Sequence, residues 1–192
     1  MTVSVSNIGL QLTYNQPWVY DYQIPPQLGD KYPTMLNVIT GVQHSHDSNV
    51  ELIHSSVQQT VFIVFAKSPS FNQDLYSAMV APSLQCNLLT ETWQNGPKSG
   101  NLPSACNQTY KVETVLSIAN KQLNISYSNH VDHSKLAVCS DSGYICVGDI
   151  NRQSHQLVRG GGTVCFFDLG VQKQYMSLIQ SIDTCKQYKS NE

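Results

Sequence analysis

Short apolar runs separated by turn-forming residues recur along the chain, and this pattern predicts a fold rich in β-strands. The stretch Gln58–Ala66 contains Val61–Phe65, in which every residue is apolar and prone to β structure, as expected of a central strand. The same pattern predicts further strands at Val50–Ser55, Tyr110–Ala119, Leu123–Tyr127 and Thr163–Leu169.

Three stretches have features typical of helices. Gly170–Ile182 places apolar side chains on one helical face, and Ser70–Val80 is predicted to form a helix that ends before Pro82, which cannot donate a backbone hydrogen bond. A shorter helix is predicted at Lys31–Gly41, weakened by Pro33. Strands interspersed with a few helices predict one α/β domain, a mixed β-sheet flanked by helices. A chain of 192 residues is long enough for such a core.

A hairpin is predicted near the middle of the C-terminal half. Lys135–Cys139 and Tyr144–Gly148 are strand-like, and Ser140–Gly143 between them consists of turn formers. The most compact pairing puts Cys139 opposite Tyr144, with an error of about two residues in the register.

This register has a chemical consequence. His133 falls opposite Ile150, and Asn151 lies beside it. His133 and Lys135 are two residues apart, so in an extended segment their side chains face the same side. An imidazole that can act as nucleophile or proton donor, next to a fixed positive charge, is what phosphoryl transfer requires.

Three motifs around this hairpin resemble the C-terminal catalytic segment of the deoxyribonuclease II family, which belongs to the phospholipase D-like superfamily. They are Asp132–Lys135, Cys146–Arg152 and Arg159–Cys165. The resemblance extends from about Gly9 to Cys185. Other matching segments are Gln11–Tyr14, Pro17–Tyr20, Tyr22–Gln23, Phe65–Ser68, Asp74–Ser77, and Leu102–Ser104 with Cys106.

The resemblance implies both a fold and an activity. The family is built from two similar halves that each supply one H-x-K motif, but only His133, among six histidines, has a lysine two residues later. Residues 1–192 therefore resemble the second half alone, a single phospholipase D-like half-domain. The implied activity is that of an acid DNA endonuclease that needs no metal or other cofactor, works through a phosphohistidine and leaves 3′-phosphate ends.

The resemblance also assigns roles to individual residues. His133 would act as acid or base and the other half would supply the nucleophile, although the two roles could be reversed. Lys135 and Asn151 would hold phosphate oxygens. The second H-x-K would come from a missing N-terminal half or from a second copy in a homodimer.

Several residues near the motifs have two interpretations. Arg152 and Arg159, the only arginines, suit either DNA phosphates or surface ion pairs. Lys67 occupies a family position from which it could reach substrate. Asp132 either orients His133 or caps a turn, whereas a structural role is favoured for Asp149.

Two further features are interpreted structurally. The glycine run 160–162 is not followed by the sequence of a mononucleotide-binding loop, so it is expected to allow a tight backbone path. His44 and His46 lack further ligands in the sequence, so a metal site there is disfavoured.

The cysteines indicate an oxidising compartment. There are six, without the spacing of a zinc site, and six cysteines allow fifteen pairings. The family resemblance implies Cys106–Cys185 and Cys146–Cys165, which leaves Cys86 and Cys139 either paired or free. Asn107 and Asn124 begin glycosylation sequons.

These features favour a secreted or lysosomal protein. No run approaches the roughly twenty apolar residues of a membrane span, so no membrane partner is expected. The first residues do not resemble a signal peptide, and we expect the natural N-terminus to lie upstream.

The charge pattern favours an acidic setting. The net charge is −2 at pH 7 with neutral histidines. Protonation of all six near pH 5 would bring it to about +4, which suits a polyanion such as DNA. Two alternatives stay open: a secreted pseudoenzyme that binds nucleic acid or a host protein, and, less favoured by the motifs, a lipid phosphodiesterase.

Overall fold

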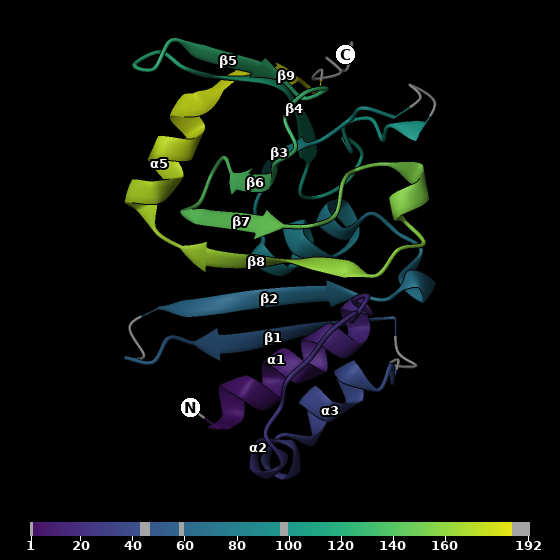
Figure 1. Ribbon diagram of the computed structural model, residues 1–192. Helices are drawn as coiled ribbons and strands as arrows, with labels where there is room; N and C mark the ends of the chain where they lie inside the picture. The colour runs from purple at the N-terminus through teal and green to yellow at the C-terminus, as the bar shows by residue number, and fades with distance from the viewer. Residues whose placement is uncertain (1, 43–46, 58–59, 97–99, 186–192) are drawn as a thin grey trace.

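The computed structural model describes residues 2–42, 47–57, 60–96 and 100–185. His44 and His46 lie outside this part of the chain. Among the described residues, nine strands form one sheet, in the order β1-β2-β8-β7-β6-β3-β4-β5, with β9 also paired to β4 (Figure 1). The strands are β1 (Ser48–His54), β2 (Val61–Lys67), β3 (Leu88–Thr92), β4 (Val112–Asn120), β5 (Ile125–Ser128), β6 (Lys135–Cys139), β7 (Tyr144–Gly148), β8 (Gly161–Phe167) and β9 (Ile179–Asp183).

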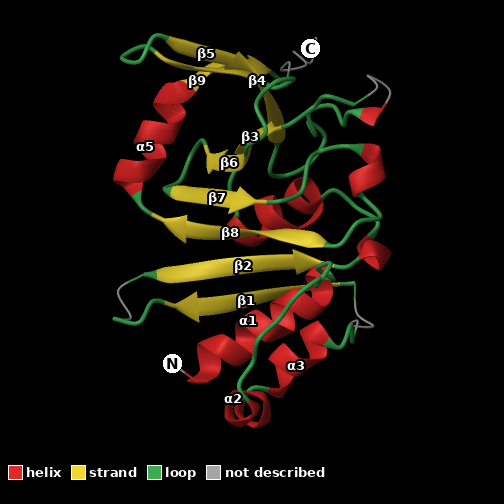
Figure 2. Cartoon of the chain, viewed as in Figure 1, coloured by secondary structure: helices red, strands yellow, loops and turns green. Residues whose placement is uncertain are grey.

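The sheet is mixed, as the sequence pattern predicts. β3 and β4 are parallel, and the other described pairs are antiparallel. A π-helical turn and α4 lie behind the middle strands, whereas α1 and α3 pack near β1 (Figure 2). The helices are α1 (Thr2–Asn15), α2 (Pro26–Lys31), α3 (Pro33–Ile39), the π-helix η2 (Tyr76–Val80), α4 (Ala81–Leu84) and α5 (Leu169–Leu178).

The β6–β7 hairpin has the predicted register. Leu136 pairs with Val147 and Val138 pairs with Ile145, the same alignment that places Cys139 opposite Tyr144. The strands begin at Lys135 and end at Gly148, so the ladder does not continue to His133. Loops therefore set the positions of His133, before β6, and of Asn151, after β7.

Two of the predicted helices differ in extent. The helix predicted to stop before Pro82 continues through it, because Pro82 lies near the start of α4, where a backbone donor is not required. The helix predicted to reach Ile182 ends at Leu178, and Ile179 is extended. The residues that follow form β9, because the edge of β4 offers them hydrogen-bonding partners.

α1, α2 and β3 were not predicted. α1 is rich in β-branched and polar residues, and it forms because it packs against α3 and the first two strands. β3 contains Thr90, Glu91 and Thr92 without polar–apolar alternation, yet all five of its residues are buried between two other strands.

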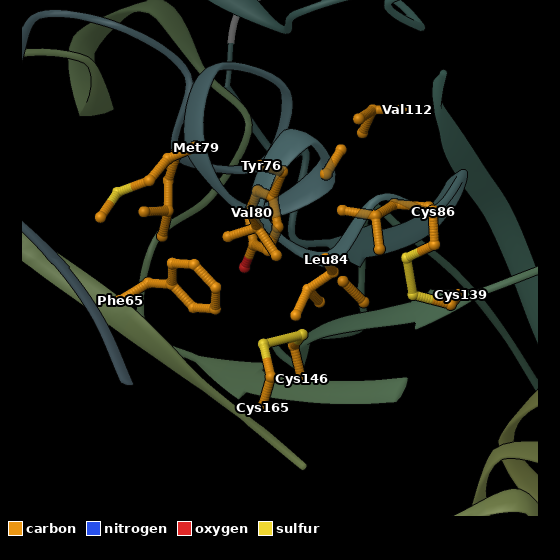
Figure 3. Packing of buried hydrophobic residues seen from close by; sticks show 14 of the residues in the cluster. Phe65, Tyr76, Met79, Val80, Leu84, Cys86, Val112, Cys139, Cys146 and Cys165 are labelled. Carbon is orange, nitrogen blue, oxygen red and sulfur yellow. A yellow bond between two sulfur atoms is a disulfide. The ribbon is translucent and has the colours of Figure 1, made fainter. Parts of the chain in front are cut away.

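The main core lies between the sheet and the turns of η2 and α4 (Figure 3). Phe65, Cys146 and Cys165 point from the sheet towards Tyr76 and Leu84. Three disulfides stabilise the fold, and they are the pairs that the resemblance implied, with the remaining two cysteines also joined: Cys86–Cys139, Cys106–Cys185 and Cys146–Cys165.

Candidate active site

His133 lies in the loop that connects β5 to β6. The Asp132 carboxylate accepts a hydrogen bond from the Ser134 backbone N–H at 2.9 Å, and the Asp132 N–H donates to the Ser128 carbonyl at 3.1 Å. Asp132 therefore caps a turn, one of its two expected roles. The turn leaves the imidazole exposed to solvent.

Trp93 brings His133 and Lys135 to one place. The Trp93 and His133 ring centroids are 3.9 Å apart, and the Lys135 Nζ lies 5.8 Å from the Trp93 centroid. The indole is fixed in turn, because its Nε1 donates to the His130 carbonyl at 2.8 Å. No sequence motif pointed to Trp93, which follows β3, a strand that was itself not predicted.

The Lys135 ammonium is partly withdrawn from water. It donates to the backbone carbonyl of His133. Burial lowers its pKa, the carboxylates of Asp132 and Asp149 oppose this shift, and the charge of Arg159 adds to it. The site thus contains a cation close to the imidazole, with Arg159 near enough to act on it.

Asn151 follows β7 and is buried. Its backbone N–H donates to Gln156 Oε1 at 3.3 Å, and its Oδ1 has no partner among the described residues. Directly before it, the Ile150 carbonyl accepts from the Tyr76 hydroxyl at 3.1 Å. No hydrogen bond within the described structure joins Asn151 to His133 or Lys135, so its grouping with them stays a prediction.

Arg152 has a structural role, which corrects its assignment to substrate phosphate or to a surface ion pair. It is only 2% exposed, and its Nε lies 3.0 Å from Asp74 Oδ2. Its two terminal nitrogens donate to Thr114 Oγ1 at 2.8 Å and to the Pro103 carbonyl at 2.9 Å. Each of the three guanidinium nitrogens is thus bonded inside the protein, and burial keeps the group away from the surface that DNA would contact.

Lys67 is also internal, which corrects the expectation that it reaches substrate. The side chain is fully buried and donates to the carbonyls of Gln156 and Leu157, both at 2.9 Å, and to that of Arg159. Burial lowers its pKa to about 8, against the pull of Asp149 and Asp74. Lys67 holds the loop from which the exposed Arg159 projects.

The glycine run allows the close backbone approach that was predicted. A Cβ on Gly160 would lie 2.3 Å from the Asn15 carbonyl oxygen, and one on Gly162 would lie 2.1 Å from that of Phe65. Asp149 accepts from the Gly162 N–H at 2.7 Å, so its role is structural, as expected. These contacts fix the start of β8 beside the loop that carries Arg159.

His133 and Lys135 line a pocket of about 470 Å³ between the sheet and α5. Glu91 also lines it, 2% exposed, with no hydrogen-bond partner for either carboxyl oxygen within the described structure. Burial, with a smaller contribution from Asp132, raises the pKa of Glu91 to about 8. Sequence reasoning missed this residue.

The comparisons with known proteins agree with the motifs. A sequence profile of the family described as Deoxyribonuclease II matches residues 1–185. The chain belongs to the deoxyribonuclease II family. Similar curated relatives are cell death-related nuclease 6 of Caenorhabditis elegans, 34% identical over 96% of this chain, plancitoxin-1 of Acanthaster planci, 35% identical over 93%, and deoxyribonuclease-2-alpha of Mus musculus, 36% identical over 94%.

The deoxyribonuclease II relatives are longer than this chain. The match covers 51%, 50% and 51% of these three proteins, so the chain spans about half of their length. In this chain, the H-x-K motif from His133 to Lys135 lies in the loop before β6 and lines the pocket described above.

Three further observations bear on glycosylation, membrane contact and metal binding in this deoxyribonuclease II family chain. The sequon residues Asn107 and Asn124 are both exposed. None of the helices that the structure describes is long and apolar enough to cross a bilayer. In the described ranges, no three histidine, cysteine, aspartate or glutamate side chains are grouped as a metal site.

Proposed function

We propose that this chain is one half of an acid DNA endonuclease of deoxyribonuclease II type that uses no metal. Residues 1–192 would act as one phospholipase D-like half-domain that contributes a single H-x-K motif. The second motif would come from an upstream half or from another copy of the chain. The observation that carries the proposal is the grouping of the exposed His133 imidazole with the Lys135 ammonium at one pocket.

The proposed reaction has two steps. A histidine of the second motif attacks phosphorus and forms a phosphohistidine, while His133 donates a proton to the departing 5′-oxygen. His133, now neutral, takes a proton from water, whose oxygen attacks the phosphohistidine. The phosphate remains on the 3′-oxygen, the P–N bond breaks, and the catalytic histidine is released. The requirement for a protonated His133 explains why the enzyme would work in acid.

Cations hold the phosphate in this proposal. Lys135 and the exposed Arg159 supply positive charge to the phosphate oxygens. Asn151 is the third proposed ligand, and its amide has to turn out of its buried position to reach the substrate. Lys67 and Arg152 act indirectly, by fixing the surrounding loops.

The proposed location is secreted or lysosomal. Three disulfides are stable in an oxidising compartment, and the exposed sequons at Asn107 and Asn124 would accept glycans there. An acidic lumen would also protonate the histidines and favour contact with DNA.

The test is plasmid nicking at pH 5 in EDTA, measured across size-exclusion fractions. We expect cleavage in fractions that contain two H-x-K motifs, with 3′-phosphate ends. His133→Ala should reduce the rate to background in the same fractions. Cleavage that persists in this variant would show that the proposed site is wrong.

One observation favours a second candidate, a pseudoenzyme that binds nucleic acid or a host protein. The Lys135 ammonium donates to the backbone carbonyl of His133, and the Asn151 side chain is buried. This protein would retain DNA at pH 5 and leave it intact in every assembly, whereas the proposed nuclease would cut it.

A further inference from the structure

The pocket beside His133 has one wall formed by the sheet. Glu91 on β3 pairs with Leu136 on β6, which pairs with Val147 on β7. Directly opposed residues project from the same face of a sheet, so these three side chains leave it together. All three line the pocket. Tyr175 lines it too, from α5, the helix that runs beside this part of the sheet (Figure 1).

Away from the Asp132–Lys135 motif, the lining of this pocket is mostly apolar and aromatic, with Glu91 as its one acidic group. Tyr127 from β5 and Tyr175 from α5 contribute aromatic side chains, and Leu89 and Leu136 contribute aliphatic ones. The volume of about 470 Å³ lies within the range of small-molecule sites, about 300–1,000 Å³. Such a lining suits a flat, partly apolar ring better than it suits a phosphate.

Glu91 is the polar group for which the fold itself provides no partner. Its oxygens lack hydrogen bonds within the described residues, although leaving such a buried group unpaired is unfavourable. Burial raises its pKa to about 8, so the carboxyl is neutral in acid and offers an O–H donor beside a carbonyl acceptor. The other titratable groups around the pocket are Tyr127, Tyr175, and Asp132, His133 and Lys135 on the motif.

We propose that this pocket is a nucleobase subsite, in which the Glu91 carboxyl binds the edge of a base and the tyrosines contact its ring. The inference rests on the proposed function, because a phosphate held at His133 and Lys135 would bring the adjoining nucleoside to the same pocket. Adenine and cytosine fit best. Each carries an amino donor next to a ring nitrogen, which accepts the carboxyl proton more strongly than the carbonyl oxygens of thymine or guanine do.

Calorimetric titration of the folded, disulfide-intact chain at pH 5 tests the subsite without cleavage. The probes are deoxyadenosine 3′-phosphate, thymidine 3′-phosphate and abasic deoxyribose 3-phosphate. We expect the adenine nucleotide to bind at least about tenfold more tightly than the abasic one, with thymidine between them. Glu91→Leu should remove most of this difference. Glu91→Gln should retain it, because an amide also places a donor beside an acceptor.

Equal binding of the adenine and abasic probes would overturn the subsite, as would an unchanged preference in Glu91→Leu. If Glu91→Leu does not fold, the comparison of the adenine and abasic probes on the unaltered chain still tests the subsite. Plasmid nicking measured in parallel separates the two proposals. Base-dependent binding without nicking would refute a nuclease that two copies of this chain complete and would keep the subsite, whereas nicking with no contribution from the base would do the reverse.

Discussion

The His133 imidazole is oriented by a neighbour outside its own motif. The Trp93 indole stacks on it at 3.9 Å and is anchored by the His130 carbonyl. An indole face also favours a nearby positive charge, which benefits both a protonated His133 and Lys135. Trp93 therefore acts as a positioning residue in the proposed site.

Replacing Trp93 should separate this role from general stability. We expect Trp93→Leu to lower the nicking rate about tenfold, because the imidazole loses its platform and its favourable electrostatics. Trp93→Phe, which keeps an aromatic face, should retain most activity. The control is Trp18→Leu, at the chain's only other tryptophan, which is 91% exposed. Equal losses in Trp93→Leu and in the control would contradict the role.

Glu91 predicts a dependence of stability on pH. An unperturbed carboxyl ionises near pH 4.5, whereas this one stays neutral to about pH 8 when folded. Between these values the folded state binds more protons than the unfolded state, so stability falls as pH rises. Glu91→Gln has no carboxyl to ionise at this position, so this loss of stability at higher pH should disappear. We expect it to unfold at a higher temperature than the unaltered protein at pH 7.5 and at a similar temperature at pH 4. Melting curves that shift equally at both pH values would refute the assignment.

At the residue scale, the sequence identified the H-x-K motif but not the side chains that surround it in the fold. His133 and Lys135 follow from their spacing and motif. Trp93 and Glu91 could not be found in that way, because they come from β3, which has no alternating pattern and reaches the site by pairing with β6. Arg152 was misassigned because nearness in sequence to a motif does not show which side of the sheet a side chain enters.

At the scale of elements, Arg152 joins three segments that are far apart in the sequence. Its guanidinium bonds Asp74 just before η2, Thr114 on β4, and the Pro103 carbonyl. The ion pair is almost fully buried, so losing one partner leaves an uncompensated charge.

Arg152→Met should therefore destabilise the protein by about 3 kcal/mol, measured by urea unfolding at pH 5. Arg159→Met is the matched control, since Arg159 is exposed and is the only other arginine. It should leave the free energy of unfolding nearly unchanged and weaken the binding of DNA, with a smaller dependence on salt. A stable Arg152→Met would mean that the buried pair contributes little.

The elements that were predicted correctly are those that local sequence determines. The β6–β7 hairpin has its register because Ser140–Gly143 consists of turn formers between two strand-like runs. α1 and β9 depend instead on partners that are distant in sequence: α1 packs against α3 and β1, and β9 adds to the edge of β4. Such tertiary contacts override weak local preferences.

At the scale of the whole molecule, the site contains one H-x-K motif and the surface carries exposed aromatic residues. Trp18, Tyr20 and Tyr22 lie in the segment between α1 and α2, and Trp18 and Tyr20 are more than 90% exposed. At this exposure these side chains are not part of the core. Aromatic groups at this level of exposure are typical of surfaces that bind another protein.

If two copies complete the site, activity should depend on pairs of intact chains. The unaltered protein is mixed with His133→Ala at a constant total concentration, and the dimers are dissociated and reassembled. The mixed dimers that form contain only one His133. Only pairs of unaltered chains would then cut DNA, so nicking should fall with the square of the intact fraction, to about one quarter in an equal mixture. A linear fall would mean that each chain acts without a second His133. No cleavage at any ratio, including the unmixed protein, would mean that the second H-x-K must come from a different polypeptide segment.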